Sequence, residues 1–385
     1  MALGYSGFRR NVDMSLGQKL LHINWGLVIT VLGIGAVGVV MLYSAAQGNM
    51  DPWASRQLVR FGAGLILMMA LALVDIRIWF RYAYIIYFVV LGLLVAVELA
   101  GSVGMGAQRW LKFGSIQVQP SEIMKAALVL ALARYFHGLS PEDIGRPQFL
   151  LMPLIFVFAA AGLVIKQPDL GTAGVLILIG GAMFFIAGVR LWKFGLVLAG
   201  GLAAIPIAWQ FLHDYQKDRI ETFLDPERDP MGAGYHIFQS QIALGSGGMG
   251  GRGFLQGSQS YLNFLPEKHT DFIFTMLAEE FGLIGALAVL GLFLIVLTYG
   301  LAISLRARNH FGRLLALGIT WHIFLYVFIN VAMVTGLIPV VGVPLPLISY
   351  GGTALLTVMV SLGIMMSVYI HRDIRIPRRG LQGGE

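Results

Sequence analysis

Ten long apolar segments constrain this chain more than any other feature of its sequence. About 20 apolar residues in a helix span the roughly 30 Å hydrocarbon core of a bilayer. Runs near this length cover residues 25–46, 58–75, 82–101, 121–136, 149–165, 170–188, 193–212, 271–303, 313–336 and 347–370. A backbone surrounded by lipid must satisfy its own hydrogen bonds, which favours helices for runs of this length. The sequence therefore predicts an all-α integral membrane protein with about ten transmembrane helices.

The composition agrees with a membrane protein along the whole chain. Only 12% of the 385 residues are charged and 57% are hydrophobic, with a mean hydropathy of +0.77. A soluble globular protein is usually about 25% charged. The chain has no cysteine, which excludes a disulfide framework and a thiol nucleophile. We expect residues 1–385 to form a single polytopic membrane domain.

The basic residues predict the orientation of that domain. Most of the 27 Lys and Arg residues fall on one side when the N-terminus is placed in the cytoplasm, as the positive-inside rule requires. This assignment makes residues 1–24 a cytoplasmic N-terminus and residues 371–385 a cytoplasmic tail. It also makes residues 213–270 a large periplasmic loop between helices seven and eight. The net charge of +7 is thus a topology signal, and we do not expect nucleic-acid binding.

The long loop carries two patterns of its own. Tyr235, Phe238 and Ile242 recur at helical spacing, which predicts an amphipathic helix lying on the outer membrane face. The segment "GSGGMGGRG" (residues 245–253) matches the glycine fingerprint of dinucleotide-binding proteins, but no strand precedes it. We interpret that match as accidental.

Candidate functional residues gather near the outer ends of the predicted helices. Ionisable side chains at membrane depth are costly, so they mark functional sites by default. Four segments supply them: "AQRWLKFGSIQVQPSEIMK", "IKQPDLGT", "LPEKHTDFIFTMLAEEFG" and "PLPLISYGGT". The candidates are Arg109, Lys112, Glu122, Lys125, Lys166, Asp169, His269, Asp271, Glu279, Ser349 and Tyr350.

Several of these residues also have a structural interpretation. Thr270 and Asp271 could form only the start of a helix, with an N-cap and an acidic first turn. Glu122 and Lys125 could form a buried ion pair. His269 has no second convergent ligand in the sequence, so we predict no metal site there. Glu279 and its neighbour point about 100° apart on a helix, so one is expected to pair and one to line a polar cavity.

The shared side of these residues favours function over structure. Four separate segments bring acids and bases to the same leaflet, which predicts a polar cavity open to the outside. Arg109, Lys112 and Lys125 suit a phosphate group. Asp271 offers an acceptor for a hydroxyl proton. The expected ligand is an anionic amphiphile.

The same four segments resemble the signature stretches of the SEDS family, named for shape, elongation, division and sporulation. The quoted motifs occur in the family's order over essentially the whole chain. The stretch "GYHIFQSQIALGSGGMGGRGF" is most similar to its rod-shape-determining branch, RodA.

This resemblance implies a ten-helix protein of the bacterial inner membrane that polymerises lipid II into glycan strands on the periplasmic side. It implies a class B penicillin-binding protein as partner, together with other elongation-complex membrane proteins. The family's essential acid falls on Asp271, its motif arginine on Arg109 and its "QPD" acid on Asp169. The family's Glu/Lys pair falls on Glu122 and Lys125.

The expected chemistry is a single inverting displacement. Asp271 would accept the proton of the acceptor's 4-hydroxyl while a lipid-linked pyrophosphate leaves the donor. Basic side chains, or a divalent cation such as Mg²⁺, would stabilise the departing charge. A lipid II flippase or secondary transporter, and a non-catalytic scaffold for a penicillin-binding protein, remain as alternatives.

Overall fold

A computed structural model describes residues 14–104, 107–114, 116–211, 217–218, 221–223, 225, 233–257 and 267–377 of the chain. The rest of the predicted periplasmic loop and both ends of the chain lie outside these residues. Of the predicted cytoplasmic N-terminus, residues 1–24, the structure describes residues 14–24. A short helix, α1 (Leu16–Leu21), precedes the first span there.

Each of the ten predicted spans coincides with a helix. They are α2 (Trp25–Ala45), α3 (Ala54–Ala72), α4 (Ile76–Ala100), α5 (Pro120–His137), α6 (Pro147–Lys166), α7 (Leu170–Ala187), α8 (Leu191–Phe211), α12 (Ile273–Arg306), α13 (His310–Val334) and α14 (Gly352–Ile370). Among the described residues, eight helices are long and apolar enough to cross a membrane, and α8 adds a shorter apolar helix. The prediction of an all-α membrane protein with about ten spanning helices is confirmed.

Polar side chains just before the apolar runs fix where several helices begin. Asn24, Asp75, Asp169 and Asn309 each precede a helix and accept a hydrogen bond from a backbone N–H of its first turn. These N–H groups have no partner inside the helix, so a capping side chain satisfies them. Helices α5 and α6 instead begin with a proline, whose missing N–H costs nothing at that position.

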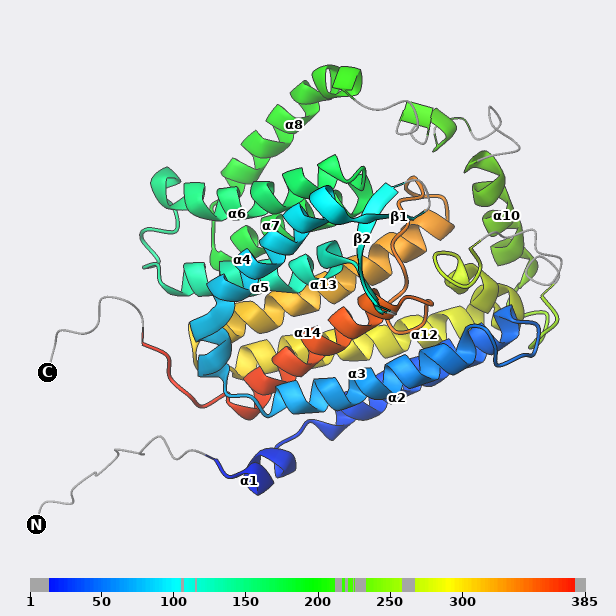
Figure 1. Cartoon of the computed structure of the whole chain (residues 1–385), viewed down its shortest axis with the longest axis horizontal. Coiled ribbons are helices and arrows are strands. Elements are labelled where there is room, and N and C mark those ends of the chain that lie inside the picture. The colour runs from blue at the N-terminus through cyan, green and yellow to red at the C-terminus, as the bar shows by residue number, and fades with distance from the viewer. Residues whose placement is uncertain are drawn as a thin grey trace, which may run out of the picture.

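The helices pack into one bundle with α5, α13 and α14 at its centre (Figure 1). Two-thirds or more of the most apolar windows of α13 and α14 are buried, whereas little more than a quarter of those of α3, α4 and α12 are. Helices α2 and α3 run side by side along one edge of the bundle. Helix α8 stands away from it, and most of its large side chains are exposed. Helices α13 and α14 are therefore shielded most completely by the rest of the bundle.

A small antiparallel sheet at one end of the bundle was not predicted from the sequence. Its strands are β1 (Ser102–Gly104), β2 (Ala107–Phe113) and β3 (Ile116–Val118), in the order β1-β2-β3. The strands are only three to seven residues long, so their alternation of apolar and polar residues is too brief to stand out. Gly114 takes a left-handed conformation, with φ of +61°, at the turn between β2 and β3. The sheet presents Arg109 and Lys112 at the bundle surface.

The last helix begins five residues later than predicted. We expected the span to start at residue 347, but α14 begins at Gly352. Leu347 has a left-handed backbone with φ of +64°, which a helix does not allow. The apolar residues before Gly352 belong instead to an irregular loop that joins α13 to α14.

The described part of the outer loop contains the predicted amphipathic helix. Helix α10 (Ala233–Ser246) exposes Phe238 and Ile242, as expected for a membrane-facing surface, while the side chain of Tyr235 lies outside the described residues. Its opposite side packs on α12, where the hydroxyls of Ser240 and Thr275 are 2.8 Å apart. The helix therefore joins the loop to the bundle.

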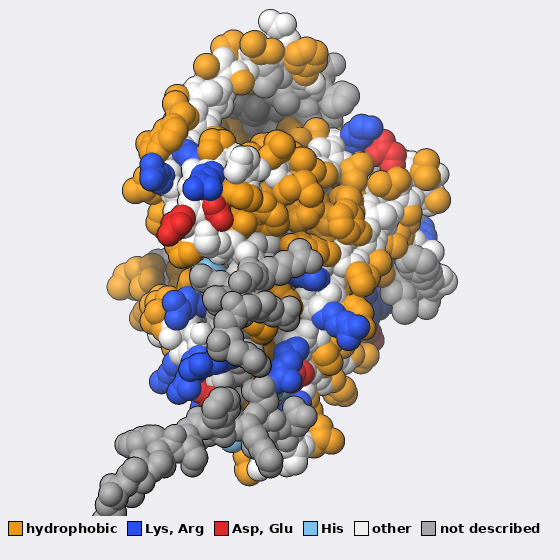
Figure 2. Space-filling model, turned by 90° about the vertical axis from the view of Figure 1, so that its left-hand side faces the viewer, with side chains coloured by type: hydrophobic (Ala, Val, Ile, Leu, Met, Phe, Trp, Pro, Cys, Tyr) orange, Lys and Arg blue, Asp and Glu red, His pale blue; other side chains and the backbone are white. Residues whose placement is uncertain are grey.

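Both described ends of the chain lie at the end of the bundle opposite the sheet (Figure 1). Lys and Arg side chains are distributed over this end (Figure 2). Arg308 and Arg372 contact Asp373 there, after the last helix. The distribution agrees with the basic loops used above to orient the chain.

Candidate active site at the sheet end of the bundle

Asp271 lies on a turn just before α12, not inside that helix. The helix begins at Ile273, and its N-cap residue, Phe272, makes no side-chain capping bond. The Thr270 hydroxyl donates to the carbonyl and the carboxylate of Glu267, at 3.2 and 2.8 Å, instead of capping the helix. The interpretation of Thr270 and Asp271 as a simple helix start is therefore wrong, because Thr270 turns back toward the preceding residues.

Asn330 of α13 holds the backbone of this turn. Its amide nitrogen donates to the carbonyl of Asp271 at 2.9 Å and to the carbonyl of Val343 at 2.8 Å. Gly342, which precedes Val343, has φ of +72°. A Cβ added to Gly342 would lie 3.5 Å from Asp271 Oδ2. The partly exposed Asp271 thus sits against the loop between α13 and α14. The sequence reasoning missed Asn330; its signal was a single amide in an apolar helix.

The predicted residues Ser349 and Tyr350 tie that loop to the same turn. Ser349 Oγ donates to the carbonyl of Thr270 at 2.6 Å and accepts the N–H of Leu345 at 2.8 Å. The N–H of Tyr350 donates to the carbonyl of His269 at 2.8 Å. Because these bonds use backbone atoms, two segments about 80 residues apart are held in fixed register beside Asp271.

Helix α3 covers this region with a row of side chains. The Trp53 ring stacks on His269 with centroids 4.3 Å apart, and the His269 ring lies 6.0 Å from that of Tyr350. The Arg60 guanidinium lies 4.8 Å from the Tyr350 ring centre. Buried Gln57 donates to the carbonyl of Ser349 at 3.2 Å. His269 therefore packs on the Trp53 ring, with the Tyr350 ring nearby.

A buried acid–base cluster lies in the first part of α12. Glu279 and Glu280 are both buried there. Ser44 donates to the Glu280 carboxylate, and the Glu279 carboxylate faces Gly257. Lys268 is also buried here; its burial lowers the pKa of the ammonium group, and the charge of Glu280 partly offsets this. Lys268 is not among the site residues predicted from the sequence.

The glycine-rich segment 245–253 fills a break in α12. Gly282 interrupts that helix with φ of +66° and ψ of −166°. Four backbone hydrogen bonds connect the segment to the break: Arg252 N to Glu279 O, Gly253 N to Glu280 O, Leu283 N to Gly248 O and Ile284 N to Met249 O. A side chain at Gly251 would collide with the backbone of Glu280. The glycines thus allow close backbone contact, which accounts for the run without a nucleotide.

Arg109 and Asp169 form a second polar site, where β2 meets the start of α7. The Arg109 guanidinium donates to the carbonyls of Gln167 and Pro168, at 3.3 and 2.5 Å, and lies 3.7 Å from Asp169 Oδ2. The Arg109 side chain is 29% exposed. Asp169 is buried and accepts two bonds from Thr172, so it caps α7 and orients Arg109 at the same time.

Two further predicted cations lie near Arg109 in the chain fold. Lys112 projects from β2, and Lys166 lies in the last turn of α6; both are exposed. An exposed ammonium group stays solvated and mobile, as expected of a cation that meets an incoming anion. The structure therefore leaves both available to a ligand from outside.

Glu122 and Lys125 are buried deeper in the bundle. Lys125 Nζ donates to Glu122 at 2.6 Å and to the Tyr326 hydroxyl at 2.7 Å. Tyr326 donates in turn to the other carboxylate oxygen of Glu122. The Lys125 side chain is 1% exposed and that of Glu122 is 6% exposed. This placement favours the structural ion pair over direct contact with a substrate phosphate.

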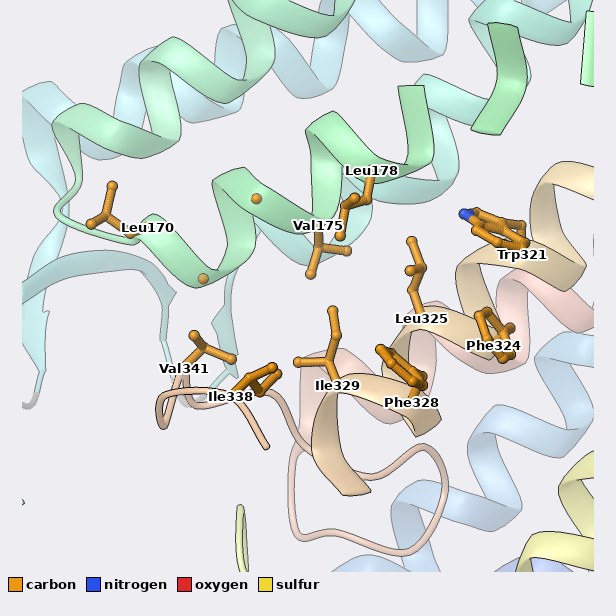
Figure 3. Close-up of a pocket in the computed structure, with 12 residues that line it drawn as sticks. Leu170, Val175, Leu178, Trp321, Phe324, Leu325, Phe328, Ile329, Ile338 and Val341 are labelled. Atoms are coloured by element: carbon orange, nitrogen blue, oxygen red, sulfur yellow. The ribbon is translucent and has the colours of Figure 1, made fainter. Parts of the chain in front are cut away.

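An apolar groove runs between α7 and α13 from the sheet end of the bundle toward its middle (Figure 3). It has a volume of about 480 Å³. Its lining is Leu170, Gly171, Gly174, Val175, Leu178, Trp321, Phe324, Leu325, Phe328, Ile329, Ile338 and Val341. Leu178 and Phe328 are half exposed, so the groove opens sideways to lipid.

The end of the groove near Leu170 and Val341 lies between two polar sites, that of Arg109 with Asp169 and that of Asp271. Leu170 and Gly171 follow Asp169 directly, and a Cβ on Gly171 would lie 2.5 Å from the carbonyl oxygen of Val341. Gly342, the next residue, faces the Asp271 carboxylate. The structure therefore brings the Arg109 site and the Asp271 site to one groove mouth.

Comparison with known proteins identifies the family. Residues 24–374 match the model of the FtsW/RodA/SpoVE family, described as cell cycle proteins. The chain is 43% identical over 357 residues to peptidoglycan glycosyltransferase MrdB of Escherichia coli K12, covering 92% of this chain and 95% of that protein. It is 36% identical to stage V sporulation protein E of Bacillus subtilis, covering 89% and 95%.

Solved structures agree with the family. A chain from a peptidoglycan synthase complex that coordinates polymerization and crosslinking superposes with a TM-score of 0.79 and 35% identity, covering 91% of this chain and 98% of that one. The rod shape determining protein RodA of Thermus thermophilus gives 0.70 and 31%, covering 91% and 98%. This chain belongs to the FtsW/RodA/SpoVE family of integral membrane proteins, which confirms the resemblance inferred from its motifs.

Proposed function

We propose that this chain is a peptidoglycan glycosyltransferase that polymerises lipid II into glycan strands for cell elongation and rod shape. The observation that carries the proposal is the position of Asp271. It is a partly exposed carboxylate on a backbone-anchored turn, at the mouth of an apolar groove that opens to lipid. A lipid-linked sugar substrate needs this combination of a base and an apolar channel.

The groove would hold the prenyl chain of one substrate, while its pyrophosphate meets the cations above. Arg109, Lys112 and Lys166 border this end of the bundle and suit phosphate oxygens. Asp169 would act by orienting Arg109. Glu122 and Lys125 would support the site from within the bundle, as a buried structural pair.

Asp271 would accept the proton of the acceptor's 4-hydroxyl on GlcNAc as that oxygen attacks C1 of the donor's MurNAc. The bond from C1 to the pyrophosphate oxygen breaks on the opposite face, and the electron pair leaves with the pyrophosphate. The product is a β-1,4 linkage, formed in one inverting step. His269, Ser349 and Tyr350 would keep the turn that carries the base in place, and Glu279 would support it from α12.

The departing charge needs a positive partner. Among the described residues no three His, Asp or Glu side chains gather in a way that would hold a metal ion. We therefore assign charge stabilisation to Arg109 and the neighbouring lysines. A Mg²⁺ ion carried by the substrate's own pyrophosphate is compatible with this assignment.

The orientation and the partner complete the proposal. Both termini would lie in the cytoplasm, and the Asp271 site would face the periplasm across the bacterial inner membrane. We expect a class B penicillin-binding protein and other elongation-complex membrane proteins as partners, since a solved relative is part of a complex that coordinates polymerization and crosslinking.

Cysteine labelling tests the orientation without background, because the chain has no cysteine. Met249 is exposed at the sheet end of the bundle and Glu142 is exposed at the opposite end. An impermeant reagent added to intact cells should label Met249→Cys and not Glu142→Cys. The reverse pattern would place the Asp271 site in the cytoplasm and refute the proposal.

The direct test of function is incubation of the purified chain with lipid II in detergent, with and without a penicillin-binding partner and a chelator. Glycan polymer on a gel supports the glycosyltransferase. A flippase would give no polymer but would move fluorescent lipid II across vesicle membranes. A scaffold would do neither and would only bind its partner. Loss of polymer on chelation alone would show that an ion is required.

A further inference from the structure

The Asp271 turn depends on one buried side chain for its position. Asn330 is fully buried in α13, and both hydrogens of its amide are used: one for the carbonyl of Asp271 and one for the carbonyl of Val343. Rotating the amide by 180° would place Oδ1 against these two carbonyl oxygens. The two carbonyl acceptors therefore fix the orientation of the Asn330 amide. Its Oδ1 has no partner among the described residues.

These two bonds set the geometry around the carboxylate. Asp271 and Val343 belong to different loops, and Gly342, which faces Asp271 Oδ2, is held through Val343. Asn330 thus links the turn that carries Asp271 to the loop that carries Gly342 and Val343. Removing the amide would leave two carbonyl oxygens without their donor and would let the two loops move relative to each other.

Asn330 also belongs to a polar stripe along α13. Residues four apart share a helix face. On this face, Tyr326 binds the Glu122–Lys125 pair, Asn330 binds the Asp271 turn, and the carbonyl of Val334 accepts the Ser240 hydroxyl of α10 at 2.7 Å. One face of one helix therefore connects the buried ion pair, the candidate base and the outer loop.

We infer that Asn330 is a positioning residue for Asp271, and that Tyr326 anchors the helix face from which Asn330 acts. The inference rests on the proposed role of Asp271 as base. Asn330 touches neither substrate nor reacting atoms; it sets where the carboxylate lies. The Glu122–Lys125 pair supports the site by holding Tyr326 on this helix face, and it does not contact a substrate phosphate.

The test compares the full-length chain with Asn330→Leu and Asn330→Ser, using Thr320→Val as the control. Thr320 lies on the same helix. Its hydroxyl donates to the carbonyl of Ala316 within that helix at 2.7 Å and lies 3.9 Å from the sulfur of Met365. Loss of the positioning bonds should lower kcat for lipid II polymerisation about 10- to 100-fold and leave KM nearly unchanged, because misplacement by about 1 Å is enough for such a loss. Thr320→Val should retain the wild-type kcat.

A double variant separates positioning from general destabilisation. If Asn330 acts through Asp271, then Asn330→Leu should cause little further loss of rate in an Asp271→Asn background. A full additional loss there, or an equal loss from Thr320→Val, would overturn the inference. Asn330→Ser keeps one hydroxyl donor and gives the same readout if the leucine variant does not fold.

Hydrogen exchange gives a readout that does not need activity. Asn330→Leu should speed amide exchange in peptides covering residues 267–273 and 345–351 and leave the Glu142 end unchanged. Faster exchange together with no polymer from the wild type would reject the proposed function while keeping the positioning role. Unchanged exchange in those peptides would reject the positioning role itself.

Discussion

The Glu122–Lys125–Tyr326 cluster and the Asp271 turn use polar groups in opposite ways. The first is closed: three buried side chains satisfy one another, and Lys125 is 1% exposed. The second is partly exposed and is held through backbone carbonyls by Asn330 and Ser349. The contrast separates a buried cluster whose side chains satisfy one another, as a scaffold requires, from a partly exposed turn whose position is set through its backbone.

The largest effect on stability should come from breaking the closed cluster. Lys125→Met removes the cation and leaves Glu122 charged, buried and short of a partner. We expect a loss of about 3–5 kcal/mol in the free energy of unfolding, seen as a lower Tm in detergent.

The matched control is the double variant Glu122→Gln/Lys125→Met, which removes both charges together. It should recover much of the Tm and of the polymerising activity. A stable but inactive double variant would show instead that the pair contacts substrate, and the contrast drawn above would not hold.

A smaller effect should follow from disturbing the glycine-rich segment 245–253, which fills the break in α12. Gly251→Ala places a Cβ against the Glu280 carbonyl at a residue with φ of +81°. The left-handed conformation and the overpacking together should cost about 2–4 kcal/mol. Gly250→Ala, where a Cβ meets nothing within 4 Å, is the control and should be nearly neutral in thermal unfolding.

Substitution of Arg109 should affect catalysis with little effect on stability. Arg109→Ala removes a partly exposed guanidinium, so folding should change little. We expect kcat/KM for lipid II to fall about 10- to 100-fold, the equivalent of about 1.5–3 kcal/mol for a bond to a charged group. Arg109→Lys should restore part of it, because it keeps the charge without the two-pronged geometry. A wild-type rate from Arg109→Ala in steady-state assays would remove Arg109 from the site.

The smallest effect concerns pH. Burial lowers the pKa of His269; the charge of Glu267 raises it in part, and that of Lys268 lowers it. A histidine with a lowered folded pKa binds its proton more readily when unfolded. Its contribution to stability is present above the unfolded pKa of about 6.5 and is lost as pH falls toward the folded pKa.

His269→Gln should therefore flatten the fall in Tm between pH 7 and pH 5, measured by thermal unfolding in detergent. An unchanged slope in the variant would mean that other groups dominate this pH range.

The sequence predicted the helices well and the site in part. Apolar runs are local signals, and they placed all ten spans. Arg109, Asp271 and Ser349 could be named because charge and motif mark them. Asn330 and Tyr326 could not, since their roles depend on segments dozens to hundreds of residues away. The break at Gly282 was also hidden, because its explanation lies in the glycine-rich segment that fills it.

The central claim is that the Asp271 carboxylate is the base, and an isosteric substitution tests it most directly. Asp271→Asn keeps the shape of the side chain and the backbone bond to Asn330 but is a far weaker base. Glu267→Gln, a carboxylate on the same turn, is the control. With equal Tm confirmed, lipid II polymerisation by purified Asp271→Asn should fall roughly 10²–10⁴-fold, whereas Glu267→Gln should keep most of the rate. Polymer formation by Asp271→Asn at the wild-type rate would contradict the account.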